Sequence, residues 1–185
     1  MHENQFTVNV KDLEEGPVTL NVECLPADLE LEDPEYTFPE PVRGSVVFKL
    51  VRPRVVANGE LETVGVSQCV RCLGEARVTV KAPVNAIYEN QKEMREGRSE
   101  VVTAEEQIVT PFNGDWIQPE EELRESLALE LPSLPLCKPD CKGLCPRCGA
   151  NLNEGPCNCP TEETEAEEVS SWKEALKGVK LDGGE

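Results

Sequence analysis

The side chains best suited to chemistry in this chain are cysteines. Its 185 residues include nine cysteines and one histidine. Eight of the cysteines form four close pairs, and two thiolates separated by a tight turn can both reach one tetrahedral zinc ion at about 2.3 Å. These pairs favour all-thiolate zinc sites: Cys69 with Cys72, Cys137 with Cys141, Cys145 with Cys148, and Cys157 with Cys159.

The order of the pairs along the chain predicts how they combine. The last two pairs follow the spacing C-x2-C-x8-C-x-C, which suits a compact zinc loop. Cys137 and Cys141 then remain for Cys69 and Cys72, across a loop of about 65 residues whose closure entropy grows only slowly with length. We therefore expect two zinc ions. One ion alone, held by the last four cysteines or by a mixture that includes Cys141, is the alternative.

Several other chemistries are less favoured. Disulfides fit poorly with an odd number of cysteines and with an N-terminus that lacks a secretory signal, and an iron–sulfur cluster is a further alternative. The single histidine, His2, lies where a chain end usually frays, so Ser-His-Asp and Cys-His catalysis lack a fixed imidazole. A zinc ion with four thiolates has no open position for a substrate. We expect no catalytic residues and no small-molecule substrate. A redox dithiol role for CVRC or CPRC lacks the helix N-terminus that such motifs use.

The elements that must position these cysteines are mainly strands. Alternating apolar residues predict short strands at Phe6–Val10 and Val18–Leu25, with Cys24 as a small buried side chain. The proline-rich stretch Pro26–Pro41 is expected to be an extended loop. Residues 44–88 predict a β-meander with a hairpin turn at Asn58-Gly59 and a second turn at Cys69–Gly74. CVRC would then lie at a hairpin tip.

One amphipathic helix is expected over residues 119–131. Pro119 and three following glutamates favour its start, and Leu123, Leu127 and Leu131 form one apolar stripe. The fold class is α+β and β-rich: an antiparallel meander sheet or partly open barrel covered by one helix, with a C-terminal zinc module. The expected segments are an acidic N-terminal region (1–42), the core (43–136), the cysteine-rich module (137–160), and an acidic tail with a short helix (161–185).

The cysteine motifs and their surroundings resemble the YceD family of bacterial and plastid proteins. The resemblance runs from about Val42 to Cys159, and it is carried by CVRC, LPSLPLCKPDC and CKGLCPRCGANLNEGPCNC. It implies a cytoplasmic, non-enzymatic factor in large-subunit (23S) ribosomal RNA accumulation or processing, or in large-subunit assembly. The expected partner is large-subunit rRNA or a pre-ribosomal particle.

The charge distribution suggests where RNA would bind. The net charge is −18, yet residues 43–81 carry seven bases and three acids, net +4. A first zinc site would bring Arg71, Lys138 and Lys142 together in one basic corner, with Arg147 close by, and these cations could contact phosphates. The alternative is that each base is solvated or paired with a glutamate. The candidate RNA-binding residues are Arg43, Lys49, Arg52, Arg54, Arg71, Arg77, Lys138, Lys142 and Arg147.

The strong acidity also supports a different role. The chain could be an adaptor whose acidic surface holds a basic large-subunit ribosomal protein until rRNA is available. No apolar run approaches the roughly 20 residues of a membrane helix, so we expect no membrane partner.

Overall fold

The computed structural model describes residues 6–92 and 109–159. The chain divides into two compact units, Met1–Cys141 and Lys142–Glu185. His2, the polar stretch at 93–106 and the tail after residue 160 lie outside the described residues. The described elements are β1 Val8–Asn9, η1 Asp12–Glu14, β2 Val18–Cys24, η2 Pro26–Leu29, β3 Val42–Val51, β4 Arg54–Gln68, β5 Glu75–Asn90, β6 Val109–Phe112, β7 Trp116–Ile117 and α2 Glu120–Leu129.

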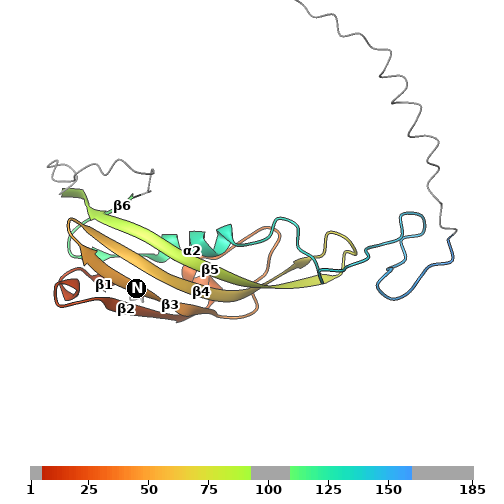
Figure 1. The fold of residues 1–185 in the computed structure, drawn as a ribbon, viewed down its shortest axis with the longest axis horizontal. Helices are drawn as coiled ribbons and strands as arrows, with labels where there is room; N and C mark the ends of the chain where they lie inside the picture. The colour runs from red at the N-terminus through yellow and green to blue at the C-terminus, as the bar shows by residue number, and fades with distance from the viewer. Residues whose placement is uncertain (1–5, 93–108, 160–185) are drawn as a thin grey trace, which may run out of the picture. The chain divides into compact units, whose positions relative to one another are not determined.

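The first unit is built on an open five-stranded sheet in the order β2-β3-β4-β5-β6 (Figure 1). Strands β2 to β5 pair antiparallel with their neighbours in sequence, which confirms the predicted meander. The side chains that point to one face are buried, because strand residues alternate between the two faces. Val46, Phe48, Leu61, Val80 and Val84 are each at most 1% exposed and belong to this core.

One predicted hairpin turn was wrong. Asn58 and Gly59 lie inside β4, and the turn between β3 and β4 is formed by Arg52 and Pro53 instead. Gly59 serves a close approach of neighbouring backbone, since a Cβ there would lie 2.2 Å from the carbonyl oxygen of Ser45. The glycine is thus required by strand packing rather than by a turn.

The edges of the fold contain features that the sequence patterns did not predict. Strand β6 pairs with β5 in parallel, and β1 and β7 form a separate two-stranded sheet. The proline-rich stretch contains the short helix η2, and its Thr37 forms an isolated bridge with Val66 of β4. Cys24 is 6% exposed and belongs to the core, as expected, and burial raises the pKa of its thiol to about 11.

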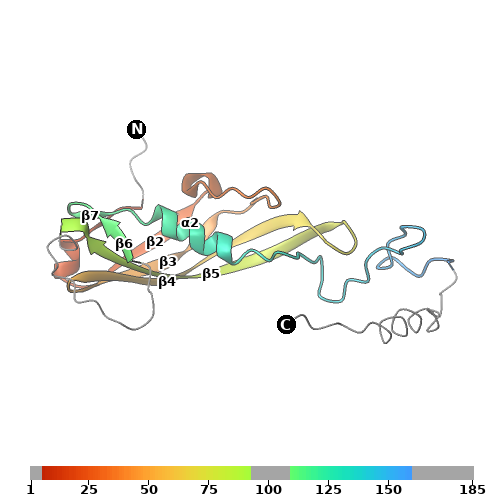
Figure 2. The same ribbon diagram turned by 90° about the horizontal axis from the view of Figure 1, so that it is seen from above.

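Helix α2 covers one face of the sheet (Figure 2). It packs on β5 and β4. Leu123 and Leu127 are at most 1% exposed, and Leu131 packs against the same core from just beyond the helix end. Pro119 precedes the first helical residue, and three glutamates occupy the first turn, where the positive end of the helix dipole favours them. The predicted leucine stripe is confirmed as core.

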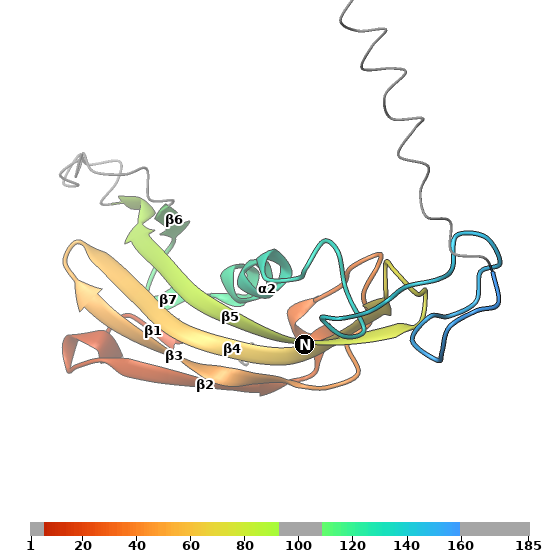
Figure 3. The ribbon, with the colours of Figure 1, turned by 45° about the vertical axis from the view of Figure 1, so that its right-hand side comes forward.

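Strands β4 and β5 continue beyond the rest of the sheet. The pairing of β3 with β4 ends at Glu62, whereas β4 and β5 remain paired as far as Gln68 and Glu75. The last six residues of β4, 63–68, and their partners in β5 therefore form a two-stranded arm (Figure 3). Isolated two-stranded ribbons are marginally stable in water, so the end of this arm needs another attachment.

Among the described residues, no helix has both the length and the apolar character needed to cross a membrane.

Candidate metal centres

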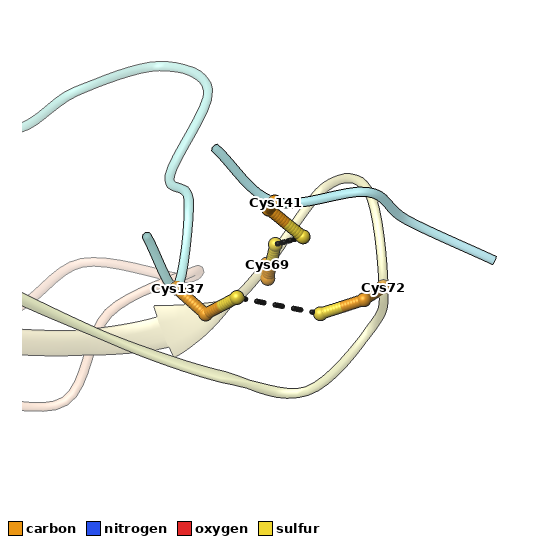
Figure 4. Close-up of side chains that lie close together, drawn as sticks. All are labelled: Cys69, Cys72, Cys137 and Cys141. Atoms are coloured by element: carbon orange, nitrogen blue, oxygen red, sulfur yellow. Dashed lines mark hydrogen bonds between the residues drawn. The ribbon is translucent and has the colours of Figure 1, made fainter. Parts of the chain in front are cut away.

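The first cysteine cluster lies at the tip of the two-stranded arm. Cys69 and Cys72 belong to the turn between β4 and β5, whereas Cys137 and Cys141 come from the segment that follows α2 (Figure 4). All four sulfurs lie within 4.8 Å of one another. Sγ of Cys69 lies 3.8 Å from that of Cys141, and Sγ of Cys72 lies 3.5 Å from that of Cys137.

These separations fit one metal ion. Four sulfurs placed tetrahedrally at about 2.3 Å from a zinc ion lie about 3.8 Å from one another. Cys69 is fully buried and Cys141 is 2% exposed, so bulk water has little access to the two sulfurs. Four thiolates that converge in this way could hold a zinc ion, and they would leave no coordination position for a substrate.

The second cluster is local to the second unit. It consists of Cys145, Cys148, Cys157 and Cys159, whose sulfurs also lie within 4.8 Å of one another. Cys145 is buried, Cys148 is exposed, and the remaining two are half-buried. The two clusters have the membership that the spacing predicted, and none of these eight described cysteines forms a disulfide.

The two Cys-x-Arg-Cys motifs fold into the same small loop. The amide of Cys69 donates to the carbonyl of Gly74, and the amide of Leu73 donates back to the carbonyl of Cys69. In the second loop, the amide of Cys145 donates to the carbonyl of Ala150, and the amide of Gly149 donates to the carbonyl of Cys145. The residue after the second cysteine has a left-handed backbone in both loops, with φ of 58° at Leu73 and 73° at Gly149.

These loops direct backbone amides at the first sulfur of each motif. Burial alone would raise the pKa of Cys69, but the amides of Cys137, Cys72 and Arg71 donate to its sulfur and lower the pKa to about 6. The amides of Cys148 and Arg147 similarly lower the pKa of Cys145 to about 6. Each loop therefore stabilises a thiolate before any metal binds.

Cys137 and Cys159 retain their protons more strongly than Cys69 and Cys145. The neighbouring thiol of Cys72 and burial raise the pKa of Cys137 to about 12. Cys148 has the same effect on Cys159, whose pKa is also raised to about 12. Four crowded thiols cannot all ionise together without a positive charge among them, and a bound divalent cation would supply that charge.

Polar contacts outside the sulfurs also fix the first cluster. The amide of Val70 donates to the carbonyl of Pro135 at 3.0 Å, and the Arg71 guanidinium donates to the carbonyl of Cys141 at 2.9 Å. The hydroxyl of Tyr36 donates to the carbonyl of Pro132 at 2.6 Å. Tyr36 was not predicted from the sequence, because it lies in the proline-rich stretch and carries no motif.

Most candidate RNA-binding bases on the sheet are paired with carboxylates. The nitrogen–oxygen distances are 3.2 Å for Arg43–Glu23, 2.7 Å for Arg52–Glu14, 2.9 Å for Arg54–Glu89 and 2.9 Å for Arg77–Glu40. Glu89 is 1% exposed, so its pair with Arg54 is part of the packed structure. Lys49 is exposed on β3. These four arginines therefore each have a glutamate partner.

The remaining candidates flank the cysteine clusters. Arg71 and Lys138 lie on the two loops that hold the first cluster, and within the described residues neither forms an ion pair with a carboxylate. Lys142 and Arg147 belong to the second unit. The single basic corner formed by all four residues, like the role of each base in RNA binding, stays a prediction.

Comparison with known proteins shows which family and which relatives this chain matches. Residues 57–180 match the family described as "Large ribosomal RNA subunit accumulation protein YceD". An uncharacterized protein of Mycobacterium tuberculosis is 31% identical over 102 residues, which cover 55% of this chain and 47% of that protein. An uncharacterized protein of Mycobacterium leprae is 30% identical over 112 residues, covering 60% of this chain and 49% of that protein. The chain thus spans about half the length of these relatives.

A plant protein carries a descriptive name. "Large ribosomal RNA subunit accumulation protein YCED homolog 1, chloroplastic" of Arabidopsis thaliana is 44% identical over 41 residues, covering 22% of this chain and 13% of that protein. No solved structure matches this chain. The family match covers more than half of the chain and includes all eight clustered cysteines, so the chain belongs to the YceD family, whose name describes accumulation of the large ribosomal RNA subunit.

Proposed function

We propose that this chain is a non-enzymatic zinc-binding factor that promotes large-subunit (23S) rRNA accumulation or processing, or large-subunit assembly, by contacting rRNA in a pre-ribosomal particle. The contact surface is the tip of the two-stranded arm, defined by Val70, Arg71, Leu73 and Lys138. Zinc in the first cluster serves as a structural crosslink that holds the two loops of this tip together. The family name supports a role in rRNA accumulation, and the exposed tip beside the first cluster supports direct contact with rRNA.

The observation that carries the proposal is the contrast between two sets of cations. Arg43, Arg52, Arg54 and Arg77 on the sheet are each paired with a glutamate. Arg71 and Lys138 lie beside the first cluster, without a carboxylate partner among the described residues. Cations that do not already have a partner anion are the better ligands for phosphate.

Apolar side chains accompany these cations. Val70 is 47% exposed and Leu73 is 55% exposed. An exposed surface that combines cations with apolar side chains suits a structured RNA, in which phosphates and bases are both accessible. The strong negative charge elsewhere on the chain would restrict RNA contact to this tip.

The adaptor for a basic ribosomal protein is a second candidate. It is favoured by the net charge of −18 and by the neutralised arginines of the sheet, which leave an excess of carboxylates on the first unit. In this version the chain binds a basic large-subunit protein and makes no direct RNA contact.

The test is a titration of the full chain, loaded with zinc, against a large-subunit rRNA fragment at several salt concentrations. Arg71→Glu and Lys138→Glu should each weaken binding and reduce the slope of log K against log salt by about 1, as expected for one lost phosphate contact. Arg43→Glu is the matched control, because Arg43 is exposed and already paired with Glu23. It should change binding by less than about twofold.

Zinc content must be measured for each variant, since Arg71 also donates to the carbonyl of Cys141. The Lys138→Glu variant does not remove that hydrogen bond. Equal losses in Lys138→Glu and Arg43→Glu would contradict a contact at the tip. Binding to a basic ribosomal protein without binding to RNA would support the adaptor, and catalytic turnover would contradict a non-enzymatic role.

A further inference from the structure

A cavity in the first unit lies apart from the cysteine clusters. It has a volume of about 370 Å³ and opens beside the first turn of α2 and the segment that joins β6 to β7. Its lining includes Tyr88 from β5, Phe112, Trp116, Glu121 and Glu122. The volume is at the lower end of the range for ligand pockets, so it suits a single side chain or a small molecule.

Buried polar atoms in this cavity lack partners. Tyr88 is 1% exposed, and its hydroxyl faces the Glu122 carboxylate without forming a close hydrogen bond to any described residue. The Oε2 atom of Glu122 is also buried and has none in that part of the chain. A buried polar group without a partner destabilises the fold, so atoms of this kind around a cavity indicate that something else satisfies them.

The cavity is negatively charged. Glu121 lies 3.9 Å from Arg124, but the Glu122 carboxylate has no such neighbour in the described residues. Both glutamates are in the first turn of α2, at the positive end of the helix dipole. Burial and the nearby Glu122 carboxylate raise the pKa of Tyr88, so its hydroxyl stays protonated and neutral.

Aromatic side chains complete the lining. Phe112 and Trp116 contribute to the same cavity, and Trp116 is 54% exposed. A ring face attracts an organic cation, and an exposed indole at the rim can cover the aliphatic stem of a long basic side chain. An anionic oxygen, a phenol oxygen and aromatic rings together match an ammonium or guanidinium group on an alkyl chain.

We propose that this cavity binds a lysine or arginine side chain of a basic polypeptide. Glu122 accepts the charged hydrogen bond, Tyr88 supplies a second oxygen, and the aromatic rim packs on the stem. A polypeptide is the favoured source because it carries several cations, which the net charge of −18 attracts before one of them enters the cavity. This binding site goes beyond the proposed RNA contact and uses other residues.

The probe is a capped tri-lysine peptide, titrated by calorimetry against the full zinc-loaded chain. Glu122→Gln should weaken binding at least about tenfold, because it removes a buried charged partner. Tyr88→Phe should weaken it about fivefold. The Tyr88→Phe change leaves the net charge unaltered and removes a buried hydroxyl that forms no close hydrogen bond, so the fold should persist, as thermal unfolding can check.

The matched control is Glu125→Gln, which makes the same charge change at an exposed position of α2 outside the cavity. It should alter affinity by less than about twofold. The same peptide with acetylated lysines should not bind, and Arg71→Glu should leave binding of the unmodified peptide intact. The last result separates this site from the proposed RNA contact.

Three outcomes would overturn the proposal. The first is an equal effect of Glu122→Gln and Glu125→Gln, which would indicate general attraction to an acidic surface. The second is no binding of the peptide to the unmodified chain. The third is binding of spermidine as tightly as the peptide, which would assign the cavity to a small polyamine.

Discussion

At the residue scale, the backbone of Leu73 stands out. Leucine adopts the left-handed region at a cost of about 1–2 kcal/mol, whereas glycine does so freely. Gly149 occupies the equivalent position in the second loop, with φ of 73° against 58° at Leu73. The two loops therefore have the same left-handed backbone at this position but different residues. The side chain of Leu73 is 55% exposed.

We expect Leu73→Gly to retain both zinc ions and to raise the free energy of unfolding by up to about 1 kcal/mol, because it relieves the left-handed strain. The greater entropy of glycine in the unfolded chain offsets part of this gain. Chemical denaturation with parallel metal analysis measures both quantities. The reciprocal control is Gly149→Ala, which should lower stability by about 1 kcal/mol, since a Cβ there meets no neighbour but the backbone angle is strained. Loss of zinc from Leu73→Gly would refute this account.

The sequence allowed the cysteine pairing to be predicted, because each close pair has few possible partners and one set of four is local. The partners of the basic residues were not predictable in the same way. Arg54 meets Glu89 because β4 and β5 pair in a particular register, which brings residues 35 positions apart together. Local patterns carry no information about such a register.

At the element scale, the two-stranded arm depends on its tip. Within the sheet, residues 63–68 pair with β5, and the attachments near the end of the arm include the Thr37–Val66 bridge, the contacts of the 132–141 segment and the first cluster. A bound zinc ion adds stability because its binding energy is available only in the folded arrangement. The arm and the segment after α2 should therefore become ordered together.

Changing Cys69 and Cys72 together to serine should reduce zinc from two ions to one per chain. Inductively coupled plasma mass spectrometry on the purified protein measures this directly. Hydrogen exchange should also become faster at the amides of residues 63–68, because the arm loses the crosslink at its tip. Unchanged metal content would rule out the first cluster as a zinc site.

The elements themselves were predictable where a periodic pattern was long. The helix at Glu120–Leu129 and the long strands β3 to β5 follow from their apolar periods. The Asn58-Gly59 signal failed because the same dipeptide that favours a turn also permits close backbone contact inside a sheet. The parallel strand β6 has only four residues, too few for a pattern to identify it.

At the scale of the whole molecule, the two clusters belong to different compact units. The second cluster consists only of cysteines from residues 145–159, so a metal bound there would not crosslink the sheet. The two metal sites should consequently act on stability in different ways: the first on the sheet and its arm, the second on its own loop alone.

Changing Cys145 and Cys148 together to serine should also leave one zinc ion per chain, but the unfolding temperature of the first unit should stay within about 2 °C, because its core and its own cluster are untouched. Differential scanning calorimetry measures this shift beside the Cys69 and Cys72 variant, which should unfold at a lower temperature. A larger shift for the second pair than for the first would contradict the independence of the two units.

The long separation between the ligands of the first cluster has a consequence for synthesis. Cys72 and Cys137 are 65 positions apart, so the arm is made well before the sulfurs that complete its site leave the ribosome. The ligands of the second site lie within a short stretch after Cys141, so they emerge together, and later than those of the first cluster. A metal can therefore crosslink the end of the arm only after α2, which precedes Cys137 in the chain, has been made.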